Sequence, residues 1–166
     1  MASNASFDIS TGADLQEVDN AVNQALKEIA QRYDFKGSTA SIDFNKAEST
    51  LTLAAEDHMK ITALWDVLQT RMIRRNVPVK NLKLGDIEAA TGSSVRRVIT
   101  LQQGIASDAA RDIIKFLKDQ KLKKVQATIQ GDQLRISSAS KDELQTVIGL
   151  LRSHDFGIAL QFGNYR

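Results

Sequence analysis

The sequence predicts an α+β protein built from two tandem ferredoxin-like (βαββαβ) units with antiparallel sheets. Three observations support this prediction: segments in which apolar and polar residues alternate, helical segments with one apolar face, and the recurrence of one element order in both halves. The chain has 166 residues, of which 42% are hydrophobic and 25% charged, which suits two small folded domains. We expect helices on one face of each sheet and an open opposite face.

The second half carries the pattern most clearly. Its expected elements are strands at 99–102, 125–130, 134–137 and 160–162, and helices that begin near Ser107 and Ser140. Gly131-Asp132 lies between two alternating segments and fits the two-residue loop of a tight hairpin. Ser140 with Glu143 is the pattern of a capping box, so we expect the serine and glutamate side chains to bond each other's backbone N–H groups.

The first half repeats this order. Its expected elements are strands at 7–9, 41–44, 50–53 and 82–84, and helices that begin after Asp14 and Asp57. Equivalent elements are separated by similar offsets in the two halves, which favours a duplication. The segment 85–94, with Gly92-Ser93-Ser94 near its end, is rich in turn-forming residues and predicts a linker between the units.

Strand alternation also predicts what the open sheet faces hold. The expected outward residues of the second unit are Gln126, Thr128, Gln130, Arg135, Ser137 and Gln161. If the strands pair as expected, those of the first are Ser41, Asp43, Thr50, Thr52, Thr100 and Gln102. RNA-recognition domains of this topology stack bases on aromatic residues of this face, and here there are none. A polar face of this kind can hydrogen-bond a ligand or meet another protein.

The net charge of +2 is unevenly distributed. Residues 1–92 hold ten basic and thirteen acidic side chains, whereas residues 93–166 hold twelve and seven. The basic residues gather in two sets: Arg111, Lys115, Lys118, Lys121, Lys123 and Lys124, and Arg71, Arg74, Arg75, Arg96 and Arg97. Such sets are common on solvated helix faces, and they also occur at phosphate-binding rims. We expect a ligand site in a groove between the units, rimmed by both sets.

Nothing in the sequence favours catalysis. Without cysteine, disulfides and thiolate–metal sites are excluded, and neither His58 nor His154 has a second ligand at metal spacing. Glu56-Asp57 suits a helix start, and neither a Walker-type phosphate loop nor a dinucleotide fingerprint is present. We therefore expect no enzyme activity, no metal and no cofactor. No apolar run reaches the length of a membrane span, so we expect a cytoplasmic protein without a membrane partner.

Residues 32–37, Arg-Tyr-Asp-Phe-Lys-Gly, have two interpretations. In the first the segment is a helix exit, where basic residues complement the helix dipole, an aromatic residue seals the core and Gly37 permits the turn. In the second, Arg32 and Lys36 contact phosphate while Tyr33 or Phe35 stacks on a base. The sequence leaves both interpretations open.

Four stretches carry a resemblance to a known family through their order and spacing. They are SFDI at 6–9, RYDFKG at 32–37, LKKVQATIQGD at 122–132 and QFGNYR at 161–166. Together they resemble the YajQ family of small bacterial proteins across nearly the whole chain. The chain departs from the family at Tyr33, where Phe is usual, at Gln102, where Lys is usual, and in its linker. The missing lysine weakens an interpretation in which the start of the third helix binds phosphate.

The resemblance implies a duplicated ferredoxin-like fold in which the two units exchange their first strands. Strand 7–10 would lie in the second unit's sheet and strand 96–103 in the first's. The first unit would then comprise residues 12–103, and the second residues 104–166 with strand 6–11. The resemblance also implies nucleotide binding, with cyclic di-GMP and RNA among the proposed ligands and gene regulation as a proposed role.

We therefore predict a non-catalytic nucleotide-binding protein, with cyclic di-GMP as candidate ligand and regulation as candidate role. A cyclic dinucleotide presents two phosphates and two flat bases, which need separated cations and polar or stacking surfaces. The predicted contacts are Arg32, Tyr33, Phe35, Lys36, Lys121, Lys123, Lys124, Gln126, Gln130 and Arg135. An RNA- or DNA-binding accessory protein and an adaptor for a regulatory protein are the alternatives; steep salt dependence of polynucleotide binding would favour the former.

Overall fold

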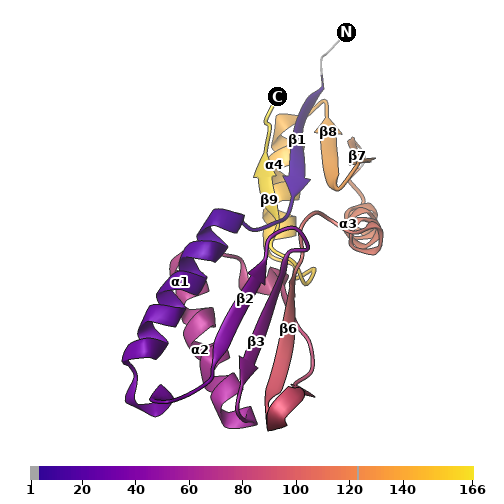
Figure 1. Cartoon of the computed structure of the whole chain (residues 1–166). Helices are drawn as coiled ribbons and strands as arrows, with labels where there is room; N and C mark the ends of the chain where they lie inside the picture. The colour runs from indigo at the N-terminus through magenta and orange to yellow at the C-terminus, as the bar shows by residue number, and fades with distance from the viewer. Residues whose placement is uncertain (1–3, 123) are drawn as a thin grey trace. The chain divides into compact units, whose positions relative to one another are not determined.

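The computed structural model describes residues 4–122 and 124–166, and it has the α+β character that the sequence predicts (Figure 1). Its helices are α1 (Leu15–Gln31), α2 (His58–Arg74), α3 (Ser107–Asp119) and α4 (Lys141–Arg152), with short 3₁₀ turns at Tyr33–Phe35, Val79–Asn81 and Thr91–Ser93. Its strands are β1 (Ala5–Ser10), β2 (Ser41–Asn45), β3 (Thr50–Ala55), β4 (Leu82–Leu84), β5 (Glu88–Ala89), β6 (Val95–Leu101), β7 (Val125–Gln130), β8 (Gln133–Ser138) and β9 (Gln161–Gly163).

The chain divides into two compact units. One is continuous and comprises Ala13–Gln102; we call it the middle unit. The other joins the N-terminal segment up to Gly12 with Gln103–Arg166; we call it the terminal unit. Each unit pairs an antiparallel sheet with helices that bury their apolar stripes against it, as expected from the alternation and helical spacing in the sequence.

The sheet of the middle unit has the order β2-β3-β6-β4, and the short β5 pairs with β6 as well. Leu51 and Leu53 on β3 point inward and are fully buried, and Leu51 lies opposite Ile99 on β6. Helices α1 and α2 pack together over this face, where Val18 of α1 and Leu64 of α2 join the same core. The alternating inward residues of β3 therefore fix which face of the sheet the helices cover.

The sheet of the terminal unit has the order β7-β8-β1-β9. β1 lies in its interior, with Phe7 opposite Ile136 and Ile9 opposite both Leu134 of β8 and Phe162 of β9. Phe7 and Ile9 have 0% exposure, and the apolar faces of α3 and α4 pack against the same core. A strand of six residues at the start of the sequence thus supplies the centre of a sheet whose other strands follow residue 124.

Local signals in the terminal unit are confirmed in one case and corrected in another. Gln130 pairs with Gln133, and Gly131 has a φ of 64°, so the predicted two-residue hairpin is confirmed. The capping box at α4 forms only in half: the Ser140 hydroxyl accepts from the Glu143 backbone N–H at 3.3 Å. The backbone N–H of Ser140 donates instead to the Ser138 hydroxyl, which in turn donates to the Glu143 carboxylate at 3.4 Å.

The predicted linker at 85–94 is wrong, because these residues belong to the middle unit. β5 pairs with the start of β6, and the backbone N–H of Gly85 donates to the Val98 carbonyl at 2.8 Å. Gly92 and Ser93 adopt φ values of 68° and 63° in the turn that reverses the chain. Glycine and serine therefore serve a tight hairpin here, and the chain passes between the units near Gly12 and Gln103 instead.

Candidate functional site

The outward face of the terminal unit's sheet is polar, as the alternation predicts. Gln126, Thr128 and Gln130 of β7 are exposed on this face, while the inward residues of β8 and β1 are buried. The strand register places Thr128 opposite Arg135, and Arg135 opposite Asp8. Polar side chains from neighbouring strands therefore form a row across the sheet, which we call the polar face.

At the centre of the polar face, Asp8 is held by two side chains. Arg135 Nε donates to Asp8 Oδ1 at 3.0 Å, and Asn164 Nδ2 donates to Asp8 Oδ2 at 2.9 Å. The hydrogen bond from Arg135, followed by that from Asn164, lowers the pKa of the Asp8 carboxyl, although the residue is only 8% exposed and burial acts in the opposite direction. Asp8 is ionised at neutral pH and fixes the guanidinium of Arg135 in position.

Arg135 retains binding capacity after this pairing. Among the described residues its terminal nitrogens, Nη1 and Nη2, make no hydrogen bond, and its side chain is 34% exposed. A guanidinium can bind a phosphate or a base edge through two parallel N–H groups, so the unused pair suits an anion or a guanine. The sequence predicted Arg135 as a contact residue but missed Asp8 and Asn164, which hold it.

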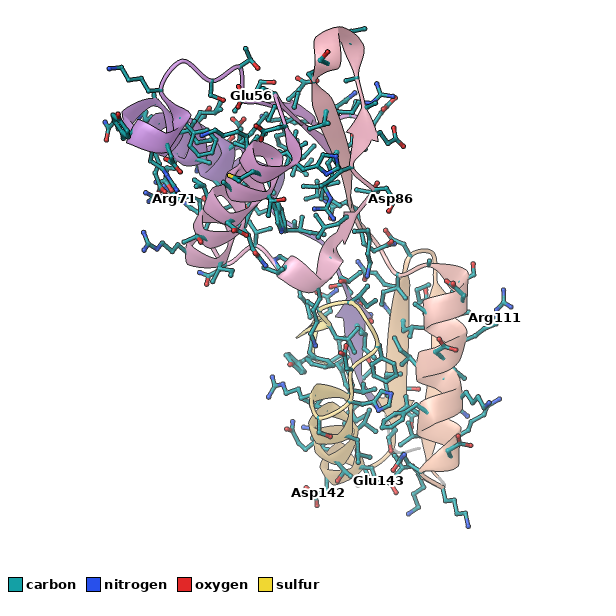
Figure 2. All side chains as sticks on the ribbon, turned by 90° about the horizontal axis from the view of Figure 1, so that it is seen from below. Glu56, Arg71, Asp86, Arg111, Asp142 and Glu143 are labelled. Carbon is teal, nitrogen blue, oxygen red and sulfur yellow. The ribbon has the colours of Figure 1, made fainter. Side chains whose placement is uncertain are left out.

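The terminal unit also carries a group of basic residues that have no ion-pair partner among the described residues. The set consists of Arg111, Lys115, Lys118, Lys121 and Lys124, which we call the α3 basic set. In the described part of the chain none of them lies within 4.0 Å of a carboxylate oxygen, and Figure 2 shows Arg111 pointing outward from α3. Lys123, predicted with them, lies outside the described residues. These charges remain available to an anionic ligand.

The predicted contacts at 32–36 belong to the middle unit. Arg32 donates through Nε and Nη2 to the two carboxylate oxygens of Asp34 at 2.9 and 2.8 Å. Phe35 is only 5% exposed and belongs to the core, with Arg32 and Lys60 stacked over its ring. Tyr33 is 90% exposed and Lys36 is exposed as well. The segment therefore has the features of a helix exit, and of its two aromatic residues only Tyr33 offers an open ring.

Four of the five arginines in the second predicted basic set are bound to oxygen atoms of the middle unit, whereas the fifth, Arg74, is exposed and forms no ion pair in the described part of the chain. Arg71 Nη2 lies 2.7 Å from Glu28 Oε1, and Arg75 Nη1 lies 3.4 Å from Glu17 Oε2 (Figure 2 labels Arg71).

The other two members contact β5 and its surroundings: Arg96 pairs with Glu88 at 3.5 Å, and Arg97 Nε donates to the Gly85 carbonyl at 2.7 Å. We call Arg71, Arg75, Arg96 and Arg97 the middle arginine set. Because these guanidiniums already have partners, the set is less suited to a phosphate rim than its sequence suggests.

The adjacent carboxylates Glu56 and Asp57 have structural partners. Asp57 Oδ1 accepts from the Lys60 backbone N–H at 2.7 Å, which confirms the predicted cap of α2. Glu56, labelled in Figure 2, accepts from the Ser38 hydroxyl at 2.7 Å and from the Thr39 backbone N–H at 3.0 Å, and these bonds lower the pKa of its carboxyl. Glu56 thus ties the segment before α2 to Ser38 and Thr39, and Asp57 caps the first turn of the helix.

The described residues contain no group of three or more His, Asp or Glu side chains placed to hold a metal ion. Across the same residues, the helices lack the length and apolar character needed to span a bilayer.

Comparisons with known proteins agree with the resemblance carried by the four sequence stretches. The family model described as "Nucleotide-binding protein YajQ-like" matches residues 5–166. A protein of Solibacter usitatus named "Nucleotide-binding protein" is 49% identical over 97% of this chain and 96% of its own length. Similarly named proteins of Geotalea uraniireducens and Bacillus cereus (strain B4264) are 50% and 49% identical, over 97% and 100% of this chain and 98% and 100% of theirs. The chain therefore belongs to the YajQ family.

Proposed function

We propose that the protein is a non-catalytic nucleotide-binding protein that binds cyclic di-GMP and acts in regulation. The family and the names of its relatives support nucleotide as the ligand class. The observation that carries the proposal is Arg135, which Asp8 fixes on the polar face with two nitrogens unused among the described residues. The α3 basic set, which belongs to the same unit, supplies further positive charge.

The chemistry of cyclic di-GMP suits this arrangement. Each guanine presents two acceptors, N7 and O6, on one edge, which match the paired N–H groups of an arginine. Gln126 and Gln130 lie on the same face of β7, four residues and about 13 Å apart, so their amides can address separate groups of one ligand. In this proposal Lys121, Lys123 and Lys124 contact phosphate, while Arg32, Tyr33 and Lys36 form a second contact region on the middle unit.

A binding role rather than catalysis is supported by the positions of the two histidines. His154 is stacked against the rings of Phe116 and Phe156, with ring centroids 4.5 Å away in both cases. His58 is the first residue of α2. Within the described residues, neither imidazole forms a hydrogen bond with a residue of the polar face. Neither histidine is therefore placed to act as a general base beside Arg135.

We further propose that the two sheets are ferredoxin-like units that have exchanged their first strands, with residues 12–103 in one unit and 104–166 plus 6–11 in the other. Both sheets have the same order when their strands are compared by position: β7-β8-β1-β9 and β2-β3-β6-β4. β1 and β6 occupy the same place in this order, each paired with a hairpin strand and an edge strand. Hydrogen exchange on a chain that lacks residues 1–10 tests this, because lost protection confined to residues 12–84 would contradict it.

Isothermal titration calorimetry with cyclic di-GMP tests the function. We expect Arg135→Lys to weaken binding about tenfold or more, since a lysine keeps a cation beside Asp8 but cannot bind with two parallel N–H groups. The double variant Lys121→Glu/Lys124→Glu should weaken it further at low salt. Lys27→Glu/Arg74→Glu is the matched control, because it makes the same charge change at exposed positions of the middle unit. Equal affinities for all four proteins would contradict the site, and absence of any nucleotide binding would contradict the function.

A nucleic-acid-binding accessory role is the second candidate, favoured by the unpaired lysines of the α3 basic set. Point charges of this kind contact phosphates without reading bases, so polynucleotide affinity would fall steeply with salt. Titration of the protein with a mixed-sequence single strand at two salt concentrations distinguishes the candidates. A steep slope without cyclic di-GMP binding favours nucleic acid, whereas binding of neither favours an adaptor for a regulatory protein.

A further inference from the structure

A hollow of about 340 Å³ opens on the helix side of the terminal unit's sheet, between β1, α4 and the last residues of the chain. Its aliphatic and aromatic floor consists of Ala5, Phe7, Leu144 and Ile148, which are 8%, 0%, 5% and 5% exposed. Tyr165 forms one wall, Lys141 contributes a cationic side chain, and Ser6 and Arg166 complete the lining. The volume lies near the lower end of the range for small-molecule sites, about 300–1,000 Å³, which suits a mononucleotide-sized ligand.

Backbone pairing holds the aromatic wall in place. The Ser6 N–H donates to the Arg166 carbonyl at 3.1 Å, and the Arg166 N–H donates to the Ser6 carbonyl at 2.9 Å. This exchange fixes Tyr165 beside β1, with its ring centroid 6.2 Å from that of Phe7 and the two rings tilted by 36°. Tyr165 nevertheless stays 61% exposed, so one side of its ring is available to a flat ligand.

The charges at the hollow favour an anion. Lys141 is the first residue of α4, where the helix N-terminus adds partial positive charge. Lys141 forms no ion pair within the described residues, whereas Arg166 attracts the Asp8 carboxylate of the polar face and helps to lower the pKa of that group. Asp142 and Glu143 follow in the first turn of α4 and are labelled in Figure 2, but neither lines the hollow, and Glu143 accepts from Ser138. The lining thus combines an apolar floor, an exposed aromatic ring and the cation of Lys141.

We propose that this hollow binds a flat ring that carries an anionic group, and that the ligand is a nucleoside 5′-monophosphate. The ring would stack on Tyr165 above Phe7, Leu144 and Ile148, and the phosphate would lie beside Lys141 at the start of α4. Gln145 also lines the hollow and offers an amide to the edge of the ring. The site rests on the proposed function for its ligand class, and it lies on the side of the sheet opposite the polar face, so it is separate from Arg135.

The test is calorimetric titration of the full chain with GMP, AMP, indole-3-acetate and inorganic phosphate. We expect binding of both nucleotides and weaker binding of phosphate alone. Tyr165→Leu should weaken GMP binding about tenfold, within the range that stacking of a base on an aromatic ring contributes. Tyr165→Phe should restore affinity, because it keeps the ring and removes only the hydroxyl. Lys141→Glu should weaken binding in a salt-dependent manner, and Lys27→Glu on α1 is the control with the same charge change.

The outcomes separate this site from the proposed function. If GMP binds and only Arg135→Lys weakens it, the hollow is not the site although the protein binds nucleotide. If indole-3-acetate binds through Tyr165 and neither nucleotide does, the ligand class assigned here is wrong. If GMP binding falls in Tyr165→Leu and Lys141→Glu and is unchanged in Arg135→Lys, the proposal holds. Amide shifts of Phe7 and Leu144 on addition of GMP, observed by NMR, would place the ligand directly.

Discussion

The middle and terminal units each pair an antiparallel sheet with two helices, but they use their cations differently. In the middle unit each arginine of the middle arginine set contacts a carboxylate or a carbonyl of that unit, at 2.7–3.5 Å. In the terminal unit the α3 basic set has no such partner among the described residues, and Arg135 is only partly engaged by Asp8. A basic cluster in a sequence therefore indicates an anion site only where its charges remain unpaired in the fold.

The charge balance of the two units supports this distinction. Ala13–Gln102 holds twelve basic and twelve acidic residues, whereas the rest of the chain holds ten and eight. The larger contrast found by cutting the sequence at residue 92 arises because Arg96 and Arg97 belong to the middle unit, and Asp8 to the terminal unit. The positive bias of the terminal unit is thus modest, and its unpaired charge is concentrated near α3 and β7.

The largest expected effect is a loss of stability in the terminal unit that leaves the middle unit folded. Phe7→Ala should destabilise the terminal unit by about 3–5 kcal/mol, because it removes a fully buried ring from the central strand of its sheet. Hydrogen exchange should show lost protection in β8, β9 and α4, with residues 13–102 keeping theirs. The exposed Tyr33→Ala is the control for loss of an aromatic side chain. Uniform loss of protection along the chain would mean that the two units unfold as one.

The second largest effect is expected from removing the charge of Asp8, the carboxylate that holds Arg135. Asp8→Asn should cost about 1.5–3 kcal/mol, the usual contribution of a hydrogen bond to a charged group. Urea denaturation at pH 7 measures this loss. Asn164→Ala should cost less, because it leaves the ion pair of Asp8 with Arg135 intact. A larger loss in Asn164→Ala than in Asp8→Asn would show that the amide rather than the ion pair holds the polar face.

The same carboxylate predicts a pH dependence. The pKa of Asp8 in the fold lies below its ordinary value of 3.8, because Arg135 and Asn164 hydrogen-bond the ionised form. Its stabilising contribution is therefore complete above about pH 5 and is lost as the pH falls through the lowered pKa. Stability of the wild type should drop more steeply between about pH 4 and 2 than that of Asp8→Asn. Parallel curves would contradict the ionised state assigned to Asp8.

Some of the contacts behind these predictions can be predicted from the sequence, and others cannot. Alternation and capping signals are local, so they located the strands other than β5, the Gly131 hairpin and the cap at Asp57. Asp8 and Arg135 are 127 positions apart, and their contact depends on which strand becomes the neighbour of β8. Alternation marks Asp8 as an outward residue, but only the register of β1 against β8 identifies its partner.

Other features escaped the sequence for related physical reasons. Glycine and serine at 92–94 look alike in a linker and in a tight turn, because both need residues that tolerate unusual backbone angles. The ion pairs of Arg71 and Arg75 join α2 to α1 across more than forty positions. The sequence therefore shows that these residues are charged but not which carboxylates pair with them. The hollow at Tyr165 likewise exists only because the end of the chain pairs with β1.

The smallest expected effect on stability tests the comparison between the cation sets most directly. Glu17→Gln/Glu28→Gln removes the carboxylate partners of Arg75 and Arg71, and it should cost at most about 1 kcal/mol per pair because these pairs are partly exposed. The fold should persist, and the middle unit should acquire unpaired guanidiniums. Its affinity for a generic single strand should then rise, with a steeper dependence on salt than the wild type shows. Lys115→Gln/Lys118→Gln removes two unpaired charges from the terminal unit, and it should change the melting temperature little while reducing the same slope. If Glu17→Gln/Glu28→Gln leaves polynucleotide binding unchanged, ion pairing does not decide which cations are available to an anionic ligand. The two units would then not differ in the way that their ion pairs indicate.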